Sequence, residues 1–76
     1  MSALTQDIIR MGNQLVDQFP HLTEEERVEA VATHIHKFWE RRMLRALYEH
    51  IEGGADDLDP VVIAAAAKIR SRQEGV

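Results

Sequence analysis

Hydrophobic positions recur along the chain at helical spacing and divide it into four segments. In residues 4–19 the apolar side chains fall three or four positions apart, so they share one face of a helix. These side chains are Leu4, Ile8, Met11, Leu15 and Phe19, with Ile9 and Val16 widening the stripe. Gly12 points into this apolar face, which indicates either a close helix crossing or a tolerated weak position. Pro20 disfavours helical backbone at Phe19 and ends the segment.

The second segment starts at Thr23, which with Glu26 has the spacing of a capping box. Its apolar stripe comprises Val28, Val31, Ala32, Ile35 and the pair Phe38 and Trp39. The next stripe comprises Met43, Leu44, Leu47, Tyr48 and Ile51, and at helical spacing it points about 100° away from the first. A straight helix cannot bury both stripes in one core, so we expect a bend between Trp39 and Arg42. The alternative is one continuous helix that serves two surfaces.

Clear sequence signals mark the end of the third helix and the start of the fourth. Gly53-Gly54 ends the third helix, and Asp59-Pro60 supplies an N-cap and a proline at the first helical position. From Val61 to Ala67 the helix is apolar on every side, which indicates either that a partner covers part of it or that alanine serves there simply as a strong helix former. We expect this helix to run from Val61 to about Arg70.

The pattern therefore predicts an all-α fold, a small bundle of about four short helices with a bend or break near residues 39–42. We expect one domain over residues 1–76, with frayed ends at residues 1–3 and 71–76.

Composition narrows the possible partners. A chain of 76 residues without cysteine has a small core and no disulfides, so we expect a partner chain to support it. The net charge of −4 argues against nucleic-acid binding, which needs a basic face. No apolar run approaches the ~18 residues of a membrane span, and the N-terminus lacks the pattern of a signal peptide. We expect a soluble, cytoplasmic protein without membrane contact.

Side chains suited to chemistry are few. Nucleophilic catalysis needs a nucleophile held beside a base, and Ser2 and Ser71 lie in the ends that we expect to be frayed. His34 and His36 are two positions apart, so on a helix they point to different faces, and a zinc site needs three or four ligands. Asp56, Asp57 and Asp59 share one loop, where we expect them to be solvated or capping. We therefore expect no catalytic, cofactor or metal site in this chain.

A basic cluster surrounds the predicted bend. Lys37, Arg41 and Arg45 are spaced one helical turn apart, with Arg42 beside them. Arginine, tryptophan and methionine are enriched in protein interfaces. In the alternative reading Trp39 anchors the core and the arginines are solvated and paired with Glu40 and Glu49. We expect a mixed arrangement, with Phe38 buried and Trp39 and the arginines partly on a contact surface. The predicted partner-binding residues are Lys37, Phe38, Trp39, Arg41, Arg42, Met43 and Arg45.

Several short motifs occur in an order that resembles one family. They are Met11-Gly-Asn-Gln-Leu15, His34-Ile-x-Lys-Phe-Trp39, Arg42-Met43, Leu47, His50, Gly53-Gly54 and Leu58-x-Pro60-Val61-Val62. This order resembles the delta subunit of soluble NAD-dependent formate dehydrogenase, over roughly residues 8–66. The family usually has Ala at the position of Gly12. It usually has Asp-Pro after the Trp, where this chain has Glu40-Arg41. The missing Asp-Pro weakens the prediction of a bend and leaves the continuous helix open.

The resemblance implies a small non-catalytic accessory subunit of a cytoplasmic complex. It would dock on the catalytic alpha subunit and support assembly or stability, and it would hold no cofactor itself. The alpha subunit would carry a molybdenum or tungsten bis-pterin centre and iron–sulfur clusters. The beta and gamma subunits would carry FMN and further clusters and reduce NAD. The alternatives are a free-standing assembly or maturation factor of the same enzyme and a small helical regulator.

Overall fold

Four helices form the part of the chain that the structure, a computed structural model, describes. This part is residues 3–74, and it contains no strand. The helices are α1 (Ala3–Val16), α2 (Glu24–Phe38), α3 (Arg41–Glu52) and α4 (Pro60–Glu74). The predicted all-α class is therefore confirmed. Residues 1–2 and 75–76, where we expect fraying, lie outside the described residues.

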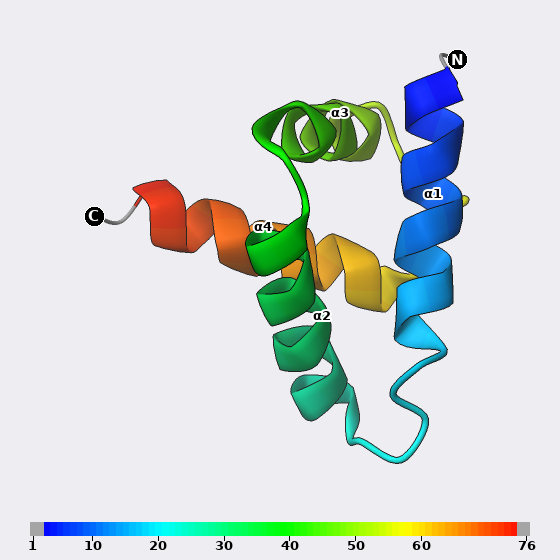
Figure 1. The fold of residues 1–76 in the computed structure, drawn as a ribbon, viewed down its shortest axis with the longest axis vertical. Coiled ribbons are helices and arrows are strands. Elements are labelled where there is room, and N and C mark those ends of the chain that lie inside the picture. Colours follow the sequence, from blue (N-terminus) through cyan, green and yellow to red (C-terminus); the bar gives the residue numbers. More distant parts are fainter. Residues whose placement is uncertain (1–2, 75–76) are drawn as a thin grey trace.

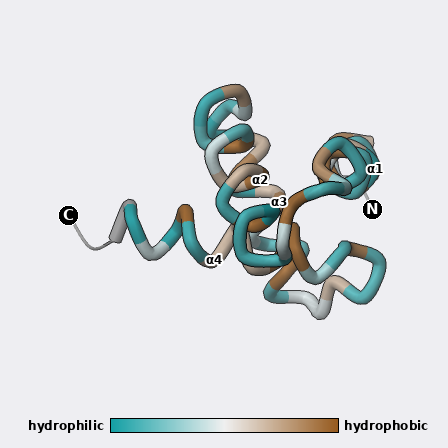
Figure 2. The backbone as a smooth tube through the Cα atoms, turned by 90° about the horizontal axis from the view of Figure 1, so that it is seen from below, coloured by the Kyte–Doolittle hydropathy of each residue, from teal (hydrophilic) through white to brown (hydrophobic). Residues whose placement is uncertain are grey.

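Helix α4 lies at the centre of the arrangement. It packs mainly against α2 and also contacts α1 and α3, while α3 packs mainly against α1. Figure 1 shows α4 starting near the base of α1, crossing behind α2 and projecting beyond it, and Figure 2 shows the same projection from another side. Val62 and Ala65 of α4 are fully buried, whereas Ala64 and Ala67 are exposed. The apolar character of α4 on all sides is thus explained by three covering helices and by alanine at its open positions.

Two predicted helix ends differ from the structure. α1 stops at Val16 and not at Phe19, because the amides of the next three residues donate to carbonyls only three positions back, at 3.1–3.2 Å. α4 continues to Glu74, although we expected it to fray after Arg70. Its last turns are attached to α2, since Lys68 and Arg72 both form ion pairs with Glu29. These two cations lower the pKa of the Glu29 carboxyl, the Lys68 hydrogen bond having the larger effect.

The predicted capping box at the start of α2 is confirmed. The Glu26 amide donates to Thr23 Oγ1 at 3.2 Å, and the Thr23 amide donates to Glu26 Oε1 at 3.0 Å. The backbone hydrogen bond from Thr23 is the main reason that the pKa of Glu26 lies below its ordinary value.

Gly12 marks a close crossing between α1 and α4. The residue is buried, and a Cβ atom built on it would lie 3.2 Å from Cγ1 of Val62. This spacing is tight but leaves room for a small adjustment, so the close-crossing interpretation is the correct one.

We expect Gly12→Leu to destabilise the protein by about 1–3 kcal/mol, because the larger side chain must push α1 away from α4. Gly12→Ala should change stability by less than about 1 kcal/mol, since the gain in helix propensity offsets the tight contact with Val62. Urea unfolding followed by circular dichroism measures both effects. Equal stability of the leucine variant and the wild type would contradict the close crossing.

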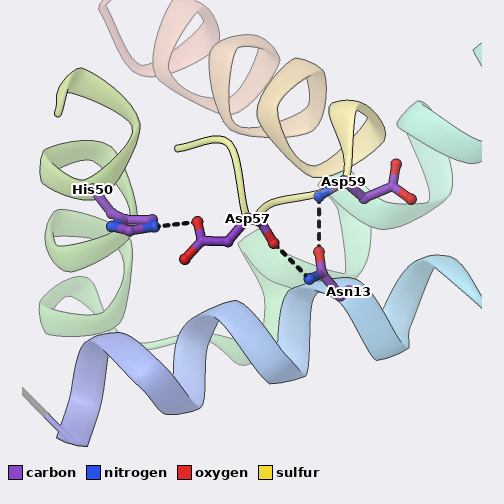
Figure 3. Close-up of polar contacts among 4 residues, drawn as sticks. All are labelled: Asn13, His50, Asp57 and Asp59. Carbon is purple, nitrogen blue, oxygen red and sulfur yellow. Dashed lines mark hydrogen bonds and ion pairs between the residues drawn. The ribbon is translucent and has the colours of Figure 1, made fainter. Parts of the chain in front are cut away.

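The loop between α3 and α4 is held by side chains from two other elements (Figure 3). The Asn13 Nδ2 donates to the Asp57 carbonyl at 2.9 Å, and Asn13 Oδ1 accepts from the Asp59 amide at 2.8 Å. His50 Nε2 lies 2.7 Å from Asp57 Oδ1. Asp59 Oδ1 accepts from the Val61 amide at 2.9 Å, which confirms the predicted N-cap of α4. The loop is therefore attached to both α1 and α3.

We expect Asn13→Ala to lower the free energy of unfolding by about 1–3 kcal/mol, because the Asp59 amide and the Asp57 carbonyl lose their partner. Gln14→Ala is the matched control, since Gln14 is the exposed neighbour on the same helix. It should change stability by less than about 0.5 kcal/mol. Chemical unfolding of the two variants side by side gives the comparison, and a similar effect of both would argue against the role of Asn13.

Candidate partner-binding surface

The helical chain breaks between α2 and α3. α2 ends at Phe38, and the next two residues are extended, with φ/ψ of −89°/137° at Trp39 and −74°/160° at Glu40. Helix α3 then begins at Arg41, and Figure 1 shows the sharp change of direction. The predicted break is confirmed, and the continuous helix is wrong. Glu40 takes the N-cap position without a capping hydrogen bond from its side chain.

The break reverses the expected exposure of two aromatic residues. Trp39 is buried, with 8% of its surface exposed, whereas Phe38 is 64% exposed. The expectation that Phe38 is buried and Trp39 partly exposed is therefore wrong. The reason is the extended backbone at Trp39, which removes its side chain from the helical spacing of α2 and directs it into the core. Trp39 borders a shallow hollow of about 180 Å³ together with Met11 and Leu15 of α1.

Five of the seven predicted partner-binding residues are at the surface. Lys37, Phe38, Arg41, Arg42 and Arg45 are exposed and surround the break. We call these five residues the α2–α3 corner. The other two predicted residues are not freely available, because Trp39 is buried and Met43 is half-buried against the core.

Every Lys and Arg residue outside the corner has a partner within the chain. Of the nine Lys and Arg residues, five make such contacts. They are Arg10 with Asp7, Lys68 and Arg72 with Glu29, Arg70 with Glu52, and Arg27 with the carbonyls of Phe19, Pro20 and Leu22.

The remaining four basic residues are those of the corner. Among the side chains that the structure describes, those of residues 3–72, neither Lys37 nor the three arginines form an ion pair or a hydrogen bond, and the alternative pairing with Glu40 and Glu49 does not occur. Arg41 and Arg42 also stand in the first turn of α3, which has no acidic residue. Positive charge there opposes the helix dipole. The corner thus carries four positive charges that form no ion pair with the described side chains.

An apolar groove runs from the corner along the outer side of α2. It has a volume of about 630 Å³, and Phe38 lies beside Phe19, Leu22 and Ala30 in its lining. The Phe38 ring packs on His34 with ring centroids 4.7 Å apart, and Lys37 Nζ lies 5.7 Å from the Phe38 centroid. The exposed ring is therefore held in place by its neighbours.

A second groove lies on the α3 side of the corner. It has a volume of about 600 Å³ and is lined by His36, Arg41, Leu44, Arg45 and Tyr48. Two unpaired guanidinium groups lie at its rim. Its floor is formed by Leu44, which is buried, and Tyr48, which is half-buried.

The described residues contain no group of three or more His, Cys, Asp or Glu side chains that could hold a metal ion. None of the four helices, as far as they are described, has the length and hydrophobicity needed to cross a membrane.

The comparison with protein families identifies a family to which the chain is similar. The NADH-dependent formate dehydrogenase delta subunit family (FdsD) matches residues 7–66. The chain belongs to this family. The matched region covers most of α1, all of α2 and α3 and the first half of α4, so it includes the whole corner of this delta subunit family member. The comparisons with curated proteins and with solved structures gave no match.

We expect Glu40→Asp to stabilise the protein by about 0.5–1 kcal/mol. Aspartate is among the best N-cap residues, because its shorter side chain reaches the free amides of the first helical turn. Glu40→Gln is the control, since it keeps the length of the side chain and should give no such gain. Thermal and urea unfolding measure the difference between the two variants. Equal stability of the aspartate and glutamine variants would show that the start of α3 does not depend on a side-chain cap.

Proposed function

We propose that this chain is a non-catalytic accessory subunit of the cytoplasmic NAD-dependent formate dehydrogenase complex. It docks on the catalytic alpha subunit and supports assembly or stability of an enzyme that also contains beta and gamma subunits. On this proposal the molybdenum or tungsten bis-pterin centre, the iron–sulfur clusters, FMN and NAD all belong to the partner subunits. Membership of the delta subunit family supports this assignment.

The single observation that carries the docking role is the selective pairing of the basic residues. Five of the nine Lys and Arg residues have partners within the described part of the chain, and the four without such a partner there all lie within residues 37–45. Unpaired arginines beside an exposed aromatic ring are the composition of an interface hot spot. A second protein could supply carboxylates that pair with the four basic residues of the corner and an apolar side chain that covers Phe38.

Two other roles predict different outcomes. A free-standing maturation factor would bind the alpha subunit during cofactor insertion and leave the finished enzyme. A nucleic-acid-binding regulator would need a broad basic face, whereas this chain has 13 acidic residues and a net charge of −4. Mass spectrometry of the mature enzyme distinguishes an accessory subunit from a maturation factor, because only an accessory subunit is recovered in stoichiometric amount.

We expect Phe38→Ala to weaken capture of the alpha subunit by the tagged full-length chain by tenfold or more, about 1.4 kcal/mol. Stability should be nearly unchanged, since the Phe38 side chain is largely exposed. Met11→Ala is the control, because among the described residues Met11 is the other exposed large hydrophobic side chain, and it lies on α1. Trp39→Ala is unsuitable as a docking test, since loss of a buried tryptophan costs about 3–5 kcal/mol of stability.

The capture is measured from native cells, with the alpha subunit quantified by mass spectrometry. The docking role is wrong if the wild-type chain captures no alpha subunit. The assignment to the corner is wrong if Phe38→Ala binds as well as the wild type while Met11→Ala does not.

A further inference from the structure

The second groove, on the α3 side of the corner, has an arrangement of charged and apolar side chains that the docking role alone does not explain. Arg41 and Arg45 stand one turn apart on the same side of α3, with Tyr48 following in line and His36 facing them from α2. Leu44 is buried and forms the floor of the groove between the two arginines. Both guanidinium groups are exposed and make no hydrogen bond with the described residues.

We infer that this groove receives an acidic segment of the alpha subunit, in which two carboxylates lie about one helical turn apart beside an apolar side chain. The inference rests on the proposed function and adds the chemistry of the contact. The two carboxylates bind Arg41 and Arg45, and the apolar side chain lies against Leu44 and Tyr48.

The spacing of the two arginines selects the ligand. Residues four apart on a helix are separated by about 6 Å along its axis. Carboxylates at positions i and i+4 of a helix, or on alternate residues of a strand at ~6.6 Å, match this separation. Each guanidinium group can bind a carboxylate through two parallel hydrogen bonds, which a lysine ammonium group cannot do.

An acidic protein segment fits this groove better than a small anion or nucleic acid. Exposed side chains from only two helices form its walls, so a small anion bound there would remain largely in contact with water. A nucleic acid would meet repulsion from the acidic remainder of the chain, whose net charge is −4 even with the corner included. A short protein segment places its carboxylates on the arginines without bringing a continuous line of negative charge.

The test compares two double variants of the full-length chain that change the net charge equally. Arg41→Gln with Arg45→Gln removes both guanidinium groups from the groove. Gln6→Glu with Arg10→Gln makes the same change in charge at exposed positions four apart on α1. We expect the groove variant to bind the alpha subunit at least tenfold more weakly at low salt, with the difference shrinking as salt is raised. The α1 variant should bind as the wild type does, and Arg41→Lys with Arg45→Lys should fall in between.

A direct binding assay uses defined probes. The probe is a labelled helical peptide with glutamates at positions i and i+4 and a leucine between them, and its controls are the same peptide with glutamines and a short DNA duplex. We expect fluorescence anisotropy to show binding of the acidic peptide to the wild type, and binding at least tenfold weaker for the glutamine peptide and for the groove variant.

Each outcome separates the inference from the proposed function. If the wild type captures the alpha subunit and the groove variant captures it equally well, the acidic-segment inference is wrong and the docking role stands. If the wild type captures no alpha subunit, the proposed function is wrong, and the inference that rests on it is wrong as well. Tighter binding of the DNA duplex than of the acidic peptide would overturn the choice of a protein ligand.

Discussion

The indole of Trp39 is buried at the point where the chain leaves α2, and the placement of α3 depends on this burial. A buried tryptophan contributes about 3–5 kcal/mol, whereas a missing N-cap costs only about 1 kcal/mol. The break is therefore maintained although Glu40 offers no capping side chain. Because two extended residues separate the helices, the apolar stripe of α2 and that of α3 both reach one core. The same geometry turns Phe38 outward and leaves the arginines of α3 exposed.

Residues that form the fold and residues available for contact are separated along the chain. Gly12 permits the crossing with α4, Asn13 and His50 hold the loop before α4, and Gly54 adopts a φ of 90° that favours glycine. Three of these positions, Asn13, His50 and Gly54, belong to the motifs of the family resemblance, whereas Gly12 departs from it. The structure gives each of the four a role in packing or in chain direction. The corner instead holds four like charges, two of them at the wrong end of a helix dipole. This arrangement disfavours the isolated chain and suits one that binds an acidic partner.

The sequence predicted the elements whose causes are local. Thr23 and Glu26 are three residues apart, and Asp59 is directly followed by Pro60, so their capping roles follow from short-range geometry alone. The contacts of Asn13 could not be predicted from its own segment, because its partners Asp57 and Asp59 lie 44 and 46 residues away. The extra turns of α4 likewise depend on Glu29 of another helix. No periodicity along one segment can reveal such contacts.

The sequence by itself determined the four helices, the change of phase near Trp39, the concentration of basic residues around it and the family. The first three follow from residue type and spacing over a few turns of helix, and the family follows from the order of short motifs over most of the chain. Only the tertiary structure decided that Trp39 enters the core while Phe38 faces solvent, because two extended residues reset the direction of the side chains. It also decided which cations are neutralised, since ion pairs such as that of Arg72 with Glu29 join distant parts of the chain. The unpaired arginines of the corner could be recognised only after those pairs were known.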